Sequence, residues 1–245
     1  MGEGAREVRV ALVTGAGGAI GGAIARRLAA DGFRVACVDV QGEQESAAAI
    51  DGAEAFHCNV ASEQQVLALR DEVKSRMGAP WLLVNVAGVF FEHRITELSE
   101  TDWDLLIDVN LKGTFLTCKT FLPAMIDSGS GCVVNIASGA GIRGGHMRAA
   151  YCAAKGGVVL LTRSLALDHG PEGVRVNCVC PGLIDTPMAD WIRHDRERLA
   201  AWEKTLPAQR IGTVDDVASA VSFLASPDAD YMHGALLVVD GGITA

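Results

Sequence analysis

The chain has 245 residues, of which 49% are hydrophobic and 21% are charged, and its formal net charge is -9. This length and composition predict one α/β domain over residues 1–245 with a large buried core, and they exclude a disordered chain. The acidic balance argues against nucleic-acid and anionic-membrane binding, because both need a positive field at the contact surface. We therefore expect a small molecule as the partner.

Targeting and metal-binding signals are missing from the sequence. There is no run of eighteen apolar residues and no charged-then-apolar leader, so we expect a cytoplasmic protein. The seven cysteines form no Cys-x-x-Cys pair, which is typical of reduced packing residues. The six histidines lack the spacing of metal ligands, and we predict no metal site.

Short runs of Val, Leu and Ile alternate along the chain with longer stretches of helical periodicity. This alternation predicts a doubly wound parallel sheet of about seven strands with helices on both faces. The predicted strands span 8–14, 34–40, 53–57, 81–86, 131–137, 173–180 and 235–239. A first helix is expected over 19–31, ending at Gly32, and further helices should begin near Thr101 and Thr213. The segment 185–207 is expected to be a partly helical lid over the substrate.

A glycine-rich turn lies between the first predicted strand and the first helix, in Thr14-Gly15-Ala16-Gly17-Gly18-Ala19-Ile20-Gly21. Backbone amides at such a helix start can bind a pyrophosphate. Asp39 ends the second strand, where its carboxylate can accept hydrogen bonds from the adenosine ribose and would repel a 2′-phosphate. Because Gln41 and not arginine follows, the pattern predicts NAD and not NADP. A tight turn without a ligand is the alternative.

A possible hydride-transfer site comes from Ser138, Tyr151 and Lys155. Positions i and i+4 share one face of a helix, so the ammonium of Lys155 can lie beside the phenol of Tyr151 and lower its pKa. A phenolate can take the hydroxyl proton when an alcohol is oxidised, and Ser138 can hold the same oxygen. Each residue alone could be structural, with Tyr151 packed, Lys155 solvated and Ser138 at a strand end. Their joint spacing favours the site.

These motifs resemble the compact branch of the short-chain dehydrogenase/reductase family over essentially the whole chain. Asn85-Val86-Ala87-Gly88 is similar to the family's Asn-Asn-Ala-Gly stretch, and Asn110 in Val109-Asn110-Leu111 is similar to its active-site asparagine. Pro181-Gly182, with Thr186-Pro187-Met188, resembles the segment that contacts the nicotinamide, and Asp240-Gly241-Gly242 matches the usual ending. The resemblance implies a Rossmann-like fold, a homotetramer and interconversion of a secondary alcohol and a ketone.

The resemblance also implies residue roles. Asn110, Ser138, Tyr151 and Lys155 would be catalytic, with Asn110 helping to hold a water, although a helix kink is the alternative role for that asparagine. The implied NAD contacts are Gly15, Gly17, Gly18, Ile20, Gly21, Asp39, Asn59, Val60, Asn85, Ala87, Gly88, Tyr151, Lys155, Pro181, Gly182, Ile184 and Thr186. Val86 replaces the family's second asparagine, and Asn59 stands where relatives often carry an aspartate.

The glycine turn leaves a second reading open. Ala19 stands where the compact branch usually has glycine, and the spacing of Gly15, Gly18 and Gly21 resembles that of epimerases and dehydratases that use NAD transiently. That branch needs a longer chain, since only about forty residues follow Thr205. A non-catalytic dinucleotide sensor is the third possibility.

The substrate contacts are predicted from residues near Tyr151 and in the lid. They are Phe90, His146, Arg148, Met188, Trp191 and Arg193. Arg148 and Arg193 could converge on a carboxylate, sulfonate or phosphate tail. The stretch from Pro181 to Trp191, together with Arg148, resembles hydroxyalkyl-coenzyme M dehydrogenases, which act on a sulfonate-tailed alcohol. Two ordinary surface arginines are the alternative.

Overall fold

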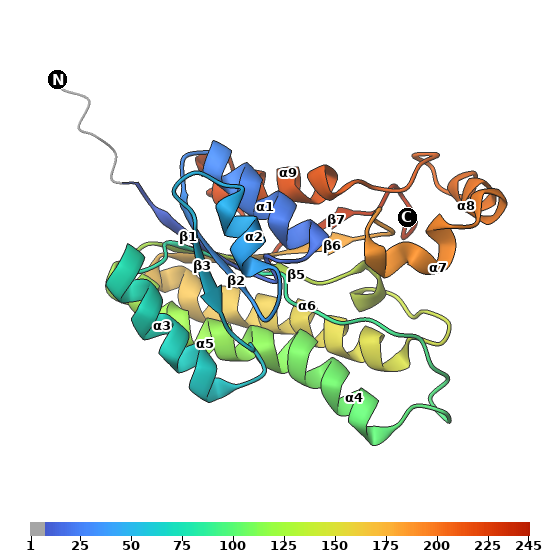
Figure 1. Ribbon diagram of the computed structural model, residues 1–245, viewed down its shortest axis with the longest axis horizontal. Helices are drawn as coiled ribbons and strands as arrows, with labels where there is room; N and C mark the ends of the chain where they lie inside the picture. The colour runs from blue at the N-terminus through green and yellow to red at the C-terminus, as the bar shows by residue number, and fades with distance from the viewer. Residues whose placement is uncertain (1–7) are drawn as a thin grey trace.

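The computed structural model describes residues 8–245 as a twisted parallel sheet between two layers of helices (Figure 1). The sheet has seven strands in the order β3-β2-β1-β4-β5-β6-β7, and every neighbouring pair is parallel. The strands are β1 Val10–Thr14, β2 Arg34–Asp39, β3 Glu54–His57, β4 Leu82–Asn85, β5 Gly131–Ile136, β6 Val174–Pro181 and β7 Leu236–Val239.

The helices are α1 Ala19–Ala30, α2 Glu43–Ala48, α3 Glu63–Met77, α4 Glu100–Ile107, α5 Gly113–Asp127, α6 Ala149–His169, α7 Asp190–Arg193, α8 Arg196–Glu203 and α9 Val214–Ala225. Figure 1 shows α1, α2 and α9 on one face of the sheet and α3, α5 and α6 on the other. Every residue of β1, β4, β5 and β6 is buried, because both faces of these strands are covered. No helix of residues 8–245 is long and apolar enough to cross a membrane.

The predicted fold class is confirmed, and all seven predicted strands are present with ends shifted by one or two residues. Thr213 caps α9 in a reciprocal box with Asp216, as the sequence indicated. The start of α4 was predicted slightly too late. Ser99 is its cap, since the Ser99 hydroxyl accepts a hydrogen bond from the amide of Asp102, and the helix begins at Glu100.

The strand order places the functional edge of the sheet. The chain runs from β1 outward to β3 and then returns to β4 on the other side of β1. The loops after β1 and β4 therefore diverge and leave a crevice at the carboxyl ends of these strands, which is where ligands bind in open α/β sheets. The loops after β5 and β6 continue the same edge.

The segment predicted as a lid contains α7 and α8 and follows β6. Figure 1 shows it at the same end of the molecule as the C-terminus. Met188, Ala189 and Trp202 of this segment line the pocket described below.

Candidate active site

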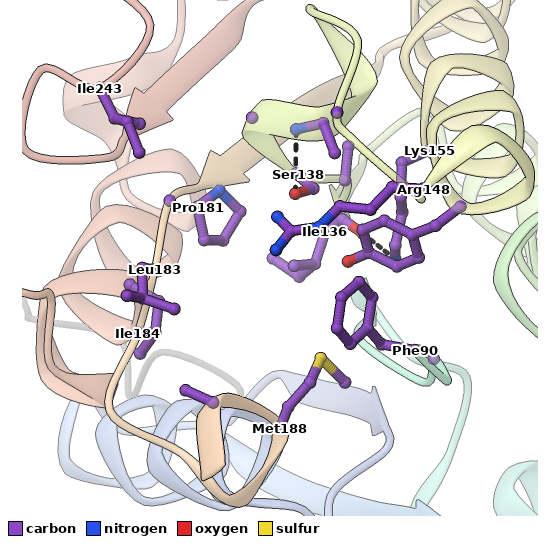
Figure 2. Close-up of a pocket in the computed structure, with 18 of the residues that line it drawn as sticks. Phe90, Ile136, Ser138, Arg148, Lys155, Pro181, Leu183, Ile184, Met188 and Ile243 are labelled. Atoms are coloured by element: carbon purple, nitrogen blue, oxygen red, sulfur yellow. Dashed lines mark hydrogen bonds between the residues drawn. The ribbon is translucent and has the colours of Figure 1, made fainter. Parts of the chain in front are cut away.

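A pocket at the carboxyl edge of the sheet is built from loops after β4, β5 and β6, the start of α6 and the C-terminal tail (Figure 2). Its lining includes all four predicted catalytic residues, Asn110, Ser138, Tyr151 and Lys155. Ser138 comes two residues after β5, whereas Tyr151 and Lys155 lie in the first two turns of α6. The structure therefore brings together residues that are up to 45 positions apart in the sequence.

Tyr151 and Lys155 are fixed by their neighbours in this pocket. The ammonium of Lys155 is buried, donates a hydrogen bond of 2.9 Å to the carbonyl oxygen of Ile136, and lies 5.9 Å from the centre of the Tyr151 ring. The ring of Phe90 meets that of Tyr151 edge to face, with centroids 5.0 Å apart. An aromatic pair of this geometry restricts the tyrosine ring to one orientation.

Burial dominates the acid–base properties of the pair. Desolvation raises the pKa of Tyr151, and hydrogen bonding to Ser138 and the charge of Arg148 only partly oppose it. This direction differs from the lowered phenol pKa that the sequence predicted, because the ring is packed among other side chains. Desolvation also lowers the pKa of Lys155 to about 8. Burial thus works against both charged forms, the phenolate of Tyr151 and the ammonium of Lys155.

Asn110 lies in a π-helical segment, Asp108–Lys112, between α4 and α5. Its side-chain amide donates to the carbonyl oxygens of Val89 and Leu106, at 3.0 and 2.9 Å. Its Oδ1 atom is buried and has no hydrogen-bond partner within residues 8–245. A Cβ atom at Gly88 would lie 2.6 Å from this oxygen and 3.5 Å from the Lys155 ammonium, so only glycine fits between them. π-helical segments of this kind are frequent at functional sites.

The glycine turn has the geometry of an anion-binding loop. Gly18 is the N-cap residue of helix α1 and has no side chain to cap it, which leaves the first amides of the helix available to a ligand. A Cβ atom at Gly17 would overlap the carbonyl oxygen of Gln41, and one at Gly21 would overlap that of Gly15. The Asp39 carboxylate accepts hydrogen bonds from the amides of Gly17 and Val40, at 2.9 and 2.7 Å. The free helix-start amides and the close backbone packing fit the phosphate groups of the dinucleotide that the sequence predicts.

The predicted nucleotide contacts fall into two groups. Those that line the pocket are Ile20, Gly88, Tyr151, Lys155, Pro181, Gly182, Ile184 and Thr186. Asn85 points elsewhere: its amide donates to Asn135 at 2.8 Å, and its oxygen accepts from Thr117 at 2.7 Å, inside the core. The side chain of Asn59 accepts from the amide of Ala61, and Val60 is buried against Gly113. Ala87 packs over Gly15, because a Cβ atom added at Gly15 would lie 2.7 Å from the amide nitrogen of Ala87.

The predicted substrate contacts are also divided. Phe90, Arg148 and Met188 line the pocket, whereas His146 and Arg193 do not. Arg193 instead pairs with Asp185 at 2.6 Å and Asp190 at 2.8 Å, so the two arginines do not converge as predicted. Asp190 lies in α7 with Arg193, and Asp185 lies in the loop before that helix, so both carboxylates are close in sequence. The side chain of Trp191 lies outside the described part of the structure.

The sequence analysis missed the C-terminal wall of the pocket. Ile243 and Thr244 line it, and Figure 2 shows Ile243 across the pocket from Lys155. Gly241 and Gly242 both have positive φ angles, 65° and 89°, and turn the chain back toward the pocket. The carbonyl oxygen of Ile243 accepts a hydrogen bond of 2.7 Å from Arg143, which holds the tail in place. The paired glycines were the available signal.

Comparison with known proteins identifies the family. A family model described as enoyl-(acyl carrier protein) reductase matches residues 15–244. The 2-(R)-hydroxypropyl-CoM dehydrogenase of Xanthobacter autotrophicus is 41% identical, and the alignment covers 97% of this chain and 99% of that protein. The chain belongs to the short-chain dehydrogenase/reductase family. This short-chain dehydrogenase/reductase is also 41% identical to the D-threitol dehydrogenase of Mycolicibacterium smegmatis, over 96% of this chain and 93% of that one.

A solved structure supports the same assignment. The crystal structure of levodione reductase has a TM-score of 0.91 to this short-chain dehydrogenase/reductase and 34% sequence identity, and covers 96% of this chain and 97% of that one. The relatives are named as dehydrogenases and reductases, so the chain is an oxidoreductase of this family. Family members typically use a nicotinamide cofactor.

Proposed function

We propose that the protein is an NAD-dependent dehydrogenase that interconverts a secondary alcohol and a ketone. The observation that carries this proposal is the convergence of Asn110, Ser138, Tyr151 and Lys155 on one pocket beside the glycine turn. The named relatives that act on hydroxypropyl-CoM and threitol give further support, because both are dehydrogenases of alcohols. A cytoplasmic homotetramer stays a prediction of the sequence.

The choice of NAD over NADP rests on Asp39. Its carboxylate is held by two backbone amides beside the glycine turn, so a charge is fixed where the adenosine ribose would lie. A ribose hydroxyl can donate to this carboxylate, whereas a 2′-phosphate would be repelled by it. When bound, NAD supplies the hydride acceptor for the reaction.

The chain's own residues handle the proton and the substrate oxygen. Ser138 and Tyr151 both face the pocket, where their hydroxyl groups can hold one substrate oxygen. For oxidation, Tyr151 must be a phenolate, because it has to take the substrate's hydroxyl proton as hydride leaves the carbon. Lys155 stabilises that phenolate by its charge. The Oδ1 atom of Asn110, which has no hydrogen-bond partner within residues 8–245, and the ammonium of Lys155 both lie beside Gly88. This oxygen can accept a hydrogen bond from a water that carries the proton away.

The charges in the pocket favour a substrate with an anionic tail. Arg143, Arg148 and Lys155 line it, and none of its described lining residues is an aspartate or a glutamate. Arginine pairs well with carboxylate, sulfonate and phosphate groups. Arg148 is the residue proposed to contact the tail, with Phe90 and Met188 forming the apolar part of the wall.

The test follows the absorbance of the reduced nicotinamide while the protein is mixed with NAD or NADP and a panel of neutral and acid-tailed secondary alcohols. We expect turnover with NAD that is lost in Tyr151→Phe while NADH binding is retained. Binding of NADH without any turnover across the panel would favour the sensor instead. Product formation without net NADH would favour the epimerase or dehydratase.

A further inference from the structure

Glu92, which the sequence analysis did not single out, forms a close ion pair with Arg148. One carboxylate oxygen of Glu92 lies 2.7 Å from Nε and 2.6 Å from Nη2 of Arg148. The side chain of Arg148 is 28% exposed and that of Glu92 is 32% exposed, so the solvent screens the pair less than it would on an open surface. Charge-assisted bonds of this length fix the plane of the guanidinium.

The ion pair belongs to a junction between two loops. The amide of His93 donates a hydrogen bond of 2.8 Å to the carbonyl oxygen of Met147. These two residues are the sequence neighbours of Glu92 and Arg148, so the bond lies beside the ion pair in both loops. Met147 has a φ angle of 58°, a left-handed conformation that a non-glycine residue adopts at a cost. The guanidinium carbon of Arg148 lies 5.2 Å from the centre of the Phe90 ring, which in turn packs on Tyr151. The junction therefore sets where Arg148 stands relative to the proposed base.

The pair also changes the charge that a substrate meets. Arg148 lines the pocket, whereas Glu92, which contacts it, is not among the lining residues. Arg143, by contrast, has a neutral partner in the carbonyl oxygen of Ile243. Of the two arginines in the lining, Arg148 is the one in a close ion pair with a carboxylate, although the charge of Arg143 also helps to lower the pKa of Asp240.

We infer that Glu92 is a specificity-determining residue, which holds Arg148 at the pocket wall and limits, through its negative charge, how strongly the pocket prefers an anionic over a neutral alcohol. This inference rests on the proposed function, because it concerns the substrate of the same pocket. An anion that binds Arg148 is repelled by Glu92 across the guanidinium, whereas a neutral tail is not.

The decisive variant is Glu92→Gln. Glutamine keeps an oxygen that can accept the hydrogen bonds of Arg148 and removes only the charge. We expect the ratio of affinities for an anionic and a matched neutral ligand to rise about fivefold to tenfold, with a smaller rise at high salt. Glu97→Gln is the matched control, since it removes the same charge from an exposed residue farther along the same loop.

The measurement is calorimetric titration of 3-hydroxybutanoate and its methyl ester into the protein with NADH present, so that neither compound can be oxidised. The ratio of the affinities for the acid and the ester should rise in Glu92→Gln and stay at the wild-type value in Glu97→Gln. In an Arg148→Ala background, Glu92→Gln should no longer change this ratio. An unchanged or lowered ratio in Glu92→Gln would overturn the inference, and so would a rise that persists without Arg148.

Turnover separates this inference from the proposed function. A protein that fails to oxidise any alcohol, yet shows the expected shift in the binding ratio, contradicts the proposed reaction and supports the role of Glu92. A protein that oxidises alcohols with NAD and shows no shift contradicts only the role of Glu92.

Discussion

The nucleotide side of the crevice and its substrate side are built in different ways. On the proposed nucleotide side, backbone atoms dominate the packing: Gly17 packs on Gln41, Gly21 packs on Gly15, and two backbone amides hold the Asp39 carboxylate. On the proposed substrate side, side chains reach across from distant segments, as Glu92 does to the Arg148 side chain and Arg143 does to the backbone of the C-terminal tail. Backbone packing tolerates little change at a given position, whereas side-chain pairs can be exchanged. Substitutions of the closely packed glycines should therefore lower stability, whereas substitutions of the charged side chains in either region should alter selectivity.

The largest expected effect tests whether Asp39 acts through its charge. Asp39→Ser is expected to lower the preference for NAD over NADP by about 10- to 100-fold, because the serine no longer repels a 2′-phosphate. The measurement is kcat/KM with each nucleotide at low ionic strength. Glu45→Gln, a change at an exposed acid in α2, is the control and should leave the preference intact. An unaltered preference in Asp39→Ser would show that another group selects the nucleotide.

A smaller effect tests the backbone contacts themselves. Gly21→Ala is expected to lower the free energy of unfolding by about 1–3 kcal/mol, because the added methyl group overlaps the carbonyl oxygen of Gly15 and the helix must shift. A Cβ atom at Gly22, in the same turn of α1, would lie 3.3 Å from the nearest atom. Gly22→Ala should therefore lower the free energy of unfolding much less. Urea unfolding of both variants checks this. Equal losses would contradict the role of close packing at Gly21.

The smallest expected change in stability comes from Lys155, which lies where the two regions meet. Lys155→Met is expected to raise the free energy of unfolding by about 1–2 kcal/mol at pH 7, because it removes a buried ammonium, while abolishing turnover. The pKa of Lys155 is about 8 in the folded chain against an ordinary value of 10.5, so the unfolded chain binds the proton more tightly. As the pH rises from 8 to 10.5, the free energy of unfolding of the wild type should therefore rise relative to that of the variant.

Urea unfolding of both proteins at several pH values tests this linkage. Above pH 10.5 the lysine is neutral in both states, and the advantage of the methionine should be gone. A stability difference that does not change between pH 8 and pH 10.5 would mean that Lys155 is not desolvated in the folded protein.

Much of the site was predictable, for reasons that differ between residues. The glycine turn, Asp39, Ser138, Tyr151 and Lys155 all follow local rules: a strand end, a helix start, or a spacing of four on one helix face. Asn85 was assigned to the nucleotide from the resemblance of Asn85-Val86-Ala87-Gly88 to the family motif, but its side chain is satisfied inside the core by Asn135 and Thr117. Local spacing places a residue at the right edge of the sheet without fixing the direction of its side chain.

The sequence by itself determined the parallel sheet, the strand-to-helix glycine turn and the acid at the end of β2, because hydrophobic periodicity and glycine geometry act over a few neighbouring residues. Only the tertiary structure decided which arginines face the pocket, that Arg193 pairs with Asp185 and Asp190, that Glu92 pairs with Arg148, and that the C-terminal tail lines the pocket. These outcomes depend on how loops that are far apart in the chain pack together, and on competition between charges that become neighbours only after folding.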